Sequence, residues 1–296
     1  MDNPEHDAYR RLVLSEFTVK RSEERRPFIR KLAYGCLDRM YSGPQPADLV
    51  AAVALPVALA TICDLLGVPY EDREFFRSCT HTMTHLDATP DEAAAARGQL
   101  QEYLVSLVTV REARPGTAFL SRMSVKHVRS ATMTPDILGA MALLLLTAGH
   151  DTAANMITLG VLTLLQHPEH LSALRDSDGP ALAARTAEEL LRYHTIVQRG
   201  IRRIALEDVD VNGHLVRAGE GVIAVINAAN RAPDRFDQAE DFAPNQDARH
   251  PLAFGYGIHQ CLGQSLARVQ LQEVYRAVAR RIPSLRLVVP VEQLSF

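Results

Sequence analysis

The chain has 296 residues, of which 47% are hydrophobic, and its formal net charge is −3 at pH 7. This length and composition allow a large core in one or two domains, and the slightly acidic balance does not favour nucleic-acid binding. The four cysteines are scattered without a pairing rhythm, which argues against a disulfide framework and is typical of a reducing compartment. The start has no apolar signal region, and the most apolar run, 140–149, is too short to span a bilayer. We therefore expect a cytoplasmic protein with no nucleic-acid or membrane partner.

Helical patterns dominate the first two thirds of the chain. Residues 5–40 carry apolar side chains at helical spacing, and Asp48 is a residue type that caps the start of a helix. A shorter helix is expected over 68–83. Thr89 and Thr134 are each followed by Pro and Asp, which predicts two further helix starts. The helix after Thr134 is very long and apolar all round at its middle, so it should cross the centre of the protein.

The character of the sequence changes towards the carboxyl end. Another helix is expected over 182–194, and 200–230 is rich in Val and Ile with turn signals between, which predicts a small sheet with hairpins. An irregular stretch, 231–260, leads to a last helix over 261–282. No repeats or low-complexity linkers are present, so we expect one domain over residues 1–296, mainly α with a small β region.

Cys261 lies in the stretch Phe-Gly-Tyr-Gly-Ile-His-Gln-Cys-Leu-Gly, at the start of the last predicted helix. Backbone N–H groups and the helix dipole favour an anion there, so we expect a depressed thiol pKa. Gly255 and Gly257 let the backbone turn tightly and approach something flat and large, while Gly263 permits close packing. Thiolates suit soft metals and haem iron. On the cysteine and glycines alone, a buried structural cysteine in a glycine-rich turn is the commoner interpretation.

Polar residues interrupt the long apolar helix at Ala-Gly-His-Asp-Thr, residues 148–152. Gly149 weakens the helix, and Asp151 and Thr152 are costly to bury unless they have a role. An adjacent acid and hydroxyl could open the helix and form a proton relay. A hydrogen-bonded polar kink explains this motif equally well when it is taken alone.

Glu189 and Arg192 lie three residues apart and can pair on one helix face, although most such pairs are ordinary surface ion pairs. The order and character of the three motifs resemble the cytochrome P450 family of haem-thiolate enzymes. The segment 148–152 is similar to the family's oxygen-activating motif, 189–192 to its Glu-x-x-Arg motif, and 230–236 to the segment that pairs with it. The segment 254–268 resembles the family's haem-binding signature at Phe254, Gly255, Gly257, His259, Cys261, Gly263, Ala267 and Arg268.

The resemblance implies roles for individual residues. Cys261 would be the metal ligand, holding the iron of haem b as a thiolate. Asp151 and Thr152 would deliver protons to iron-bound dioxygen through water. The haem-contacting residues would be Cys261, Phe254, Gly255, Gly263 and Ala148, with His6, Arg10, Arg203 and His259 on the propionates. The substrate would touch Ile196, Val197 and Ala148, and a structural cluster of Glu189, Arg192 and Arg231 would hold the cysteine loop.

The resemblance also implies a monooxygenase of the soluble bacterial type, especially that of actinomycete secondary metabolism. Such an enzyme takes electrons from a ferredoxin and its ferredoxin reductase, and it hydroxylates or epoxidises a small organic intermediate with O2. Arginines such as Arg268, Arg276 and Arg280 would face an acidic ferredoxin, with solvated surface as the alternative. Two other functions are kept open: a non-catalytic partner or scaffold of a biosynthetic enzyme, and a haem enzyme of oxidative coupling or rearrangement.

The match departs from the family pattern at both ends. The family normally supplies sheet strands, two helices and a pocket-roofing loop before the segment that contains His6, and a β-hairpin after the last helix. We therefore expect a core that lacks both parts, with a distal side more open to water. His81 and His85 are spaced for a zinc pair on a helix, but no third ligand is apparent, and substrate contact is the favoured interpretation.

Overall fold

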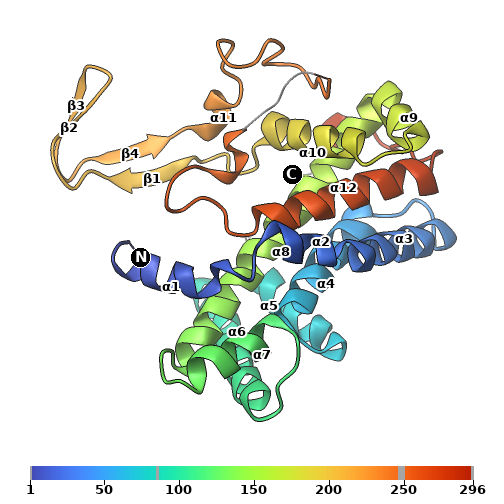
Figure 1. Cartoon of the computed structure of the whole chain (residues 1–296). Helices are drawn as coiled ribbons and strands as arrows, with labels where there is room; N and C mark the ends of the chain where they lie inside the picture. The colour runs from blue at the N-terminus through green and yellow to red at the C-terminus, as the bar shows by residue number, and fades with distance from the viewer. Residues whose placement is uncertain (1, 85–86, 246–250, 295–296) are drawn as a thin grey trace.

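The computed structural model describes residues 2–84, 87–245 and 251–294. Helices make up most of this part of the chain, and two small two-stranded sheets lie on one side of it (Figure 1). The helices are α1 (Glu5–Leu14), α2 (Val19–Glu24), α3 (Arg26–Ser42), α4 (Leu55–Leu66), α5 (Arg73–Thr84), α6 (Pro90–Ala113), α7 (Phe119–Met123), α8 (Pro135–Gln166), α9 (Pro168–Asp176), α10 (Ala181–His194), α11 (Ile226–Ala229) and α12 (Gln264–Arg281). The predicted mainly helical fold with a small β region is confirmed.

The helix starts expected from the sequence are present. The Thr89 side chain accepts a hydrogen bond from the Glu92 amide, and the Glu92 carboxylate accepts one from the Thr89 amide, which closes a capping box before α6. At the start of α8 the Thr134 side chain accepts from the Ile137 amide, without the reciprocal bond. The Asp48 carboxylate accepts from the Val50 amide at 2.8 Å, ahead of a π-helical turn that leads into α4.

The segment 5–40, predicted as helical throughout, is divided into α1, α2 and α3. The first helix ends at Leu14, and the next begins after its N-cap Thr18. The Thr18 hydroxyl accepts a hydrogen bond from the Arg21 amide at 3.3 Å. A polar capping residue offers the backbone an alternative to continuous helix, which explains the break.

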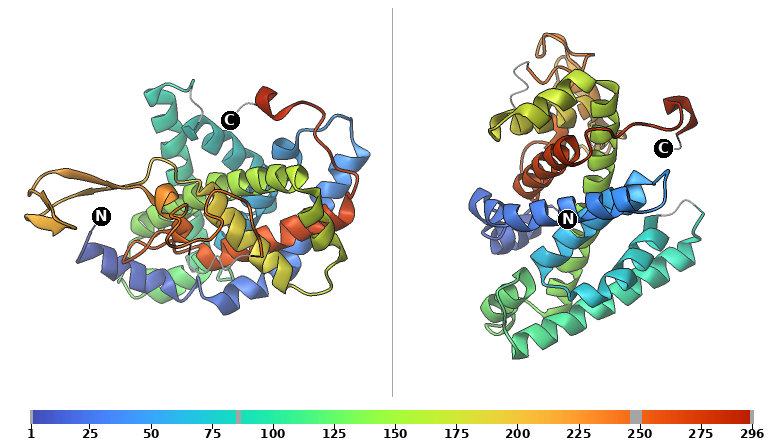
Figure 2. Two further views of the ribbon diagram at one scale, coloured as in Figure 1. Left: turned by 90° about the horizontal axis from the view of Figure 1, so that it is seen from above. Right: turned by 90° about the vertical axis from the view of Figure 1, so that its right-hand side faces the viewer.

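α8 crosses the centre of the molecule, as its length and apolar middle predict (Figures 1 and 2). It packs against α4, α6 and α12. At Gly160 a Cβ atom would lie 2.1 Å from the hydroxyl oxygen of Tyr275 on α12, and that hydroxyl donates to the Met156 carbonyl at 2.6 Å. The absence of a side chain at Gly160 is therefore what lets α12 seat against the central helix.

By length and composition α8 is the one helix in the described part of the chain that could cross a membrane. The run 140–149 was judged too short to span a bilayer, but it is only part of a longer apolar helix that extends from Pro135 to Gln166. Its surroundings identify it as a core helix: other helices cover several of its faces, and Leu144 and Ala148 face a cavity inside the fold.

Two buried clusters build the core. One joins α3, α4, α8, α10 and α12 through residues such as Leu37, Val57, Leu164, Leu190 and Val278. The other joins α4, α5, α6, α7 and α8 through residues such as Leu66, Phe76, Leu104, Phe119 and Leu146. α3, α4, α8 and α12 contribute residues to both clusters, so they connect the two parts of the helical body.

The single small sheet expected from the sequence is two separate ribbons. β1 (Ile201–Ile204) pairs antiparallel with β4 (Gly221–Ala224), and β2 (Val209–Val211) pairs with β3 (His214–Val216). Asn212 and Gly213 make the tight turn with φ of 52° and 86°, as an Asn-Gly pair predicts. The β2–β3 ribbon projects away from the helices (Figure 1).

Candidate functional site

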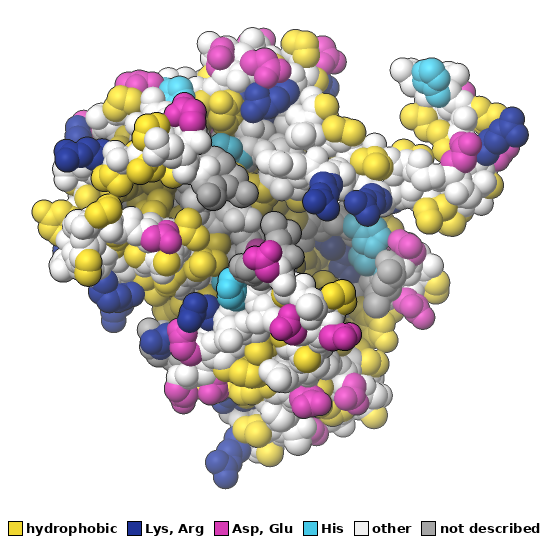
Figure 3. Space-filling view, turned by 180° about the vertical axis from the view of Figure 1, so that it is seen from behind, with side chains coloured by type: hydrophobic (Ala, Val, Ile, Leu, Met, Phe, Trp, Pro, Cys, Tyr) yellow, Lys and Arg dark blue, Asp and Glu magenta, His cyan; other side chains and the backbone are white. Residues whose placement is uncertain are grey.

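A cavity of about 850 Å³ lies between α8, the loop before α12, α1 and β1. Its walls are mainly apolar, with Ala148 and Met156 from α8 and Ile196 from the segment after α10. Seen from behind, the molecule is hollowed at its centre, and hydrophobic side chains lie in the recess (Figure 3). An apolar recess with a few polar groups at its edge is the usual form of a cofactor or small-molecule site.

The loop before α12 presents Cys261 to this cavity. The Cys261 amide donates to the Phe254 carbonyl at 2.9 Å, which closes the loop on itself. Gly255 and Gly257 have φ of 69° and 85°, in the left-handed region that favours glycine. The two glycines and this closing bond therefore give the loop its shape, as the sequence predicts.

The guanidinium of Arg268 packs against the same loop. It lies 4.6 Å from the centre of the Phe254 ring and makes an ion pair with Glu188 of α10 at 2.5 Å. These contacts tie Arg268 to α10 and to the loop, and its expected place among the arginines that face a ferredoxin stays a prediction.

The expected depression of the Cys261 pKa is wrong for the protein described here. Burial raises the pKa of the thiol above its ordinary value. The amides of Gly263 and Gln264 and the charges of Arg10 and Arg268 act in the expected direction, but they are outweighed. Helix-end electrostatics alone therefore do not make this cysteine a thiolate, whereas a metal ion bonded to it would.

Four basic side chains line the cavity and form its basic edge: His6, Arg10, Arg203 and His259. The role that the resemblance implied for them, binding of the haem propionates, stays a prediction. The His6 and His259 rings lie 4.1 Å apart, and Arg10 donates to the Gln260 carbonyl at 2.7 Å.

An acidic group already occupies part of this basic edge. The His259 ring nitrogen lies 3.0 Å from the Asp2 carboxylate. The hydrogen bond from His259, together with the charge of Arg203, holds the pKa of the Asp2 carboxyl below its usual range. The edge thus binds a carboxylate of the chain itself.

These features fit a haem. A thiol on a glycine-shaped loop faces an apolar recess, and a basic edge that accepts a carboxylate is suited to propionates. On the cavity wall, the buried Gln270 amide nitrogen lacks a hydrogen-bond partner among the described residues.

On the α8 side the two residues of the predicted relay lie apart. Thr152 lines the cavity, and its hydroxyl donates to the Ala148 carbonyl at 2.6 Å. Asp151 is not among the described cavity-lining residues, and its carboxylate lies 3.1 Å from the ring of the buried His150. The helix is unbroken over 148–152, so the opening that was one of two interpretations of this motif is not present.

The structure adds lining residues that the sequence reasoning missed. Ile137, Met141, Leu144 and Leu145 lie on the same side of α8 as Ala148 and face the cavity. The signal was available, because residues three and four apart share one helix face. Ile196 and Val197, which were predicted to touch the substrate, also line the cavity.

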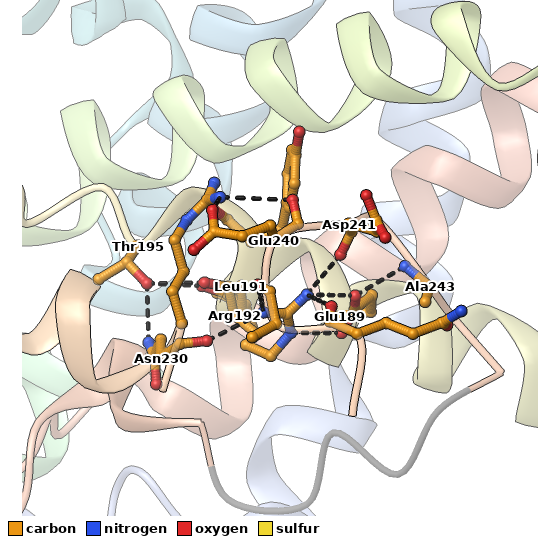
Figure 4. Close-up of polar contacts among 12 residues, drawn as sticks. Glu189, Leu191, Arg192, Thr195, Asn230, Glu240, Asp241 and Ala243 are labelled. Atoms are coloured by element: carbon orange, nitrogen blue, oxygen red, sulfur yellow. Dashed lines mark hydrogen bonds and ion pairs between the residues drawn. The ribbon is translucent and has the colours of Figure 1, made fainter. Parts of the chain in front are cut away.

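Glu189 and Arg192 form a fully buried ion pair, not the surface pair that such spacing usually gives. Two hydrogen bonds of 2.8 Å join the guanidinium to the two carboxylate oxygens (Figure 4). The pair fastens the irregular segment to α10: the guanidinium also donates to the carbonyls of Asn230, Ala239 and Asp241, and the Glu189 carboxylate accepts from the Ala243 amide. A buried pair with this many partners stabilises one chain path strongly.

Arg231 joins this region from outside the pair. It donates to the Glu240 carboxylate at 2.8 Å and to the Tyr193 carbonyl at 3.0 Å, and it lies over the Tyr193 ring. Its described partners therefore differ from those of Arg192, although both arginines tie the same segment to α10.

Comparisons with known proteins agree with this geometry. A sequence model described as cytochrome P450 matches residues 181–280. "Cytochrome P450 GfsF" of Streptomyces halstedii is 46% identical over 297 residues, which cover 100% of this chain and 72% of that protein. "Mycinamicin VIII C21 methyl hydroxylase" of Micromonospora griseorubida is 42% identical and covers 97% of this chain and 73% of its own length. The crystal structure of GfsF superposes with a TM-score of 0.94 and 45% identity, covering 99% of this chain and 74% of that one.

Sequence identity at this level over the whole chain, a shared fold and the haem-compatible cavity lead to one conclusion. The chain belongs to the cytochrome P450 family of haem-thiolate monooxygenases.

Proposed function

We propose that this protein is a cytoplasmic monooxygenase that hydroxylates or epoxidises an apolar intermediate of secondary metabolism, with its residues 1–296 acting as one haem-binding domain. The observation that carries the proposal is the position of Cys261, which faces an apolar cavity with Thr152 of α8 on its wall. Relatives whose printed names are "Mycinamicin VIII C21 methyl hydroxylase" and "Pentalenic acid synthase" support the substrate class.

The haem would be held by the groups that already surround the cavity. Cys261 would ligate the iron of haem b through its sulfur, and the loop residues Phe254, Gly255 and Gly263 would support that ligand. His6, Arg10, Arg203 and His259 would bind the propionates, with Asp2 leaving His259 as a propionate arrives. When bound, the haem supplies dioxygen activation, to which the thiolate contributes electron density.

Proton delivery would be shared between two positions on α8. Thr152 faces the cavity and can hold a water there, once its hydroxyl leaves the Ala148 carbonyl. Asp151 lies on a different side of the helix beside His150, where 34% of its side chain is exposed to solvent. The acid would therefore take protons from solvent and pass them through water to the hydroxyl.

The substrate would lie against Ala148, Ile196 and Val197. These side chains offer no charge, and Leu144 and Leu145 of α8, which also line the cavity, are aliphatic. Burial of an apolar molecule here is driven by its removal from water, and positioning by shape fixes which carbon is oxidised.

The electrons would come from a ferredoxin and its reductase. Arg276 and Arg280 flank a second recess on α12, and both donate to carbonyls of the 177–178 turn. Their charges can attract an acidic protein surface by complementarity.

The direct test is turnover by the haem-loaded protein with ferredoxin, reductase and a panel of macrolides and terpenoids. We expect a product that has gained one oxygen atom and that depends on both electron carriers. The Thr152→Ala variant should consume reducing equivalents with less product, because a proton donor is lost from the cavity wall. Haem loading without any oxygenated product across the panel, in wild type and variant alike, would favour a partner or scaffold role.

A further inference from the structure

A cluster of His167, Glu169 and His170 lies outside the cavity, where α8 ends and α9 begins. None of the three is among the described cavity-lining residues. His167 is both the C-cap of α8 and the N-cap of α9, and Pro168 follows at the first position of α9. Figure 1 places α9 beyond α10, on the side of the molecule away from the β-ribbons.

The donor atoms of this cluster are spaced for a single metal ion. The Glu169 carboxylate oxygen lies 3.4 Å from His167 Nδ1 and 3.7 Å from His170 Nε2. All three donor atoms lie within 4.8 Å of one another. Bonds of about 2.0–2.2 Å in a tetrahedral site place neighbouring donors about 3.3–3.6 Å apart. Two of the three edges therefore nearly match, and small side-chain movements would close the third.

The ring positions are supported by a buried aromatic side chain. The centre of the Phe242 ring lies 5.3 Å from the centres of both the His167 and the His170 rings. The residue before Phe242 is fixed in turn, because the Asp241 carbonyl accepts a hydrogen bond from Arg192. Histidines whose rings are packed in this way lose less freedom when they bind an ion.

Exposure and charge also suit a cation. The side chains of His167, Glu169 and His170 are 37%, 62% and 25% exposed, so an ion can reach them from solvent. The carboxylate contributes negative charge, and the carboxyl end of α8 and the amino end of α9 meet here with opposing dipoles. Two imidazoles and one carboxylate select a borderline transition metal over Ca²⁺ or Mg²⁺, which prefer oxygen ligands throughout.

We propose that His167, Glu169 and His170 bind a Zn²⁺-type divalent ion, with water in the fourth position. The ion fixes the end of the central helix to the first turn of α9, beside the segment that carries Phe242. The site is distinct from the haem and does not take part in oxygen chemistry.

The test is zinc binding by the chelator-treated, haem-loaded protein, measured by equilibrium dialysis and elemental analysis. The His81→Gln background removes one rival pair, His81 and His85. The other rival pair, His6 and His259, would hold the propionates in the haem-loaded protein. In that background we expect one zinc per chain, with affinity at least about tenfold lower after His170→Gln or Glu169→Gln, since even outer-shell changes cost that much. Both variants keep the size of the side chain they replace.

A second readout separates loss of the site from loss of the fold. Zinc should raise the melting temperature of the His81→Gln protein and leave the His81→Gln/His170→Gln protein unchanged, while both should melt alike in chelator. Equal zinc affinity with and without His170 would overturn the proposal. So would the absence of any bound zinc in the His81→Gln background.

Discussion

Cys261 lies just before a helix start, yet burial raises the pKa of its thiol. Glu189 and Arg192 are spaced like a surface pair, yet both side chains are fully buried. Removing one partner of such a pair costs about 3–5 kcal/mol, because the other charge is left in the interior. The family resemblance predicted that Glu189 and Arg192 form a structural pair, but only the fold shows that the pair is buried and therefore costly to break.

Burial of His194 should make the stability of the fold depend on pH. Burial lowers the pKa of His194 from its ordinary value of 6.5 to about 4, and the ring is hydrogen-bonded to Thr163 at 2.8 Å. Between these two pH values the unfolded chain binds a proton that the folded chain does not. The free energy of unfolding should therefore fall as the pH is lowered from 6.5 towards 4, by a contribution on the order of 3 kcal/mol.

The His194→Gln variant should flatten this part of the curve, because an amide can replace the hydrogen bond and does not titrate. The measurement is urea unfolding of the haem-loaded protein at several pH values. His214→Gln on the exposed strand β3 is the matched control and should keep the wild-type slope. Equal slopes in wild type and His194→Gln would contradict this origin.

At the scale of elements, the contact between α8 and α12 decides how the cysteine loop meets the central helix. At Gly160 an added Cβ would overlap the ring and the hydroxyl of Tyr275. The Gly160→Ala substitution should destabilise the protein by about 1–3 kcal/mol through overpacking, although alanine favours helices.

Gly98 on α6 provides the control, since a Cβ there would meet nothing within 4 Å. Gly98→Ala should stabilise the protein by about 0.5–1 kcal/mol by restricting the unfolded chain and favouring helix. Thermal unfolding of both variants makes the comparison. A Gly160→Ala protein as stable as Gly98→Ala would show that α12 can shift without cost.

Local signals predicted the helix starts well, and the contacts between distant segments less well. Thr89 and Thr134 cap helices because the chemistry of a cap is contained within four residues. The separation of Asp151 from Thr152 was also predictable, since neighbouring residues on a helix point about 100° apart. The packing of Phe242 on His167 was not, because it depends on a segment about seventy-five residues further along the chain, which Arg192 fixes in place.

At the scale of the whole molecule, the cavity is where the separate parts of the chain meet. α1, β1, α8 and the loop before α12 each supply part of its wall. The two buried clusters of the core hold α1, α8 and the loop in place, and β1 pairs with β4. A haem bound there would contact all of them at once. Ligand binding to the folded chain alone adds to stability by mass action, so the fold and the cofactor should support each other.

The central claim is that Cys261 ligates a haem in this cavity, and the carbon-monoxide difference spectrum of the reduced, purified protein tests it most directly. We predict a Soret band at the position diagnostic of thiolate ligation, and its loss in the Cys261→Ser variant. The Cys63→Ser variant, which changes a buried cysteine of α4 that does not line the cavity, should retain the band. A haem-loaded wild-type protein with the band of a neutral or histidine ligand, or a Cys261→Ser protein with an unchanged spectrum, would contradict the account.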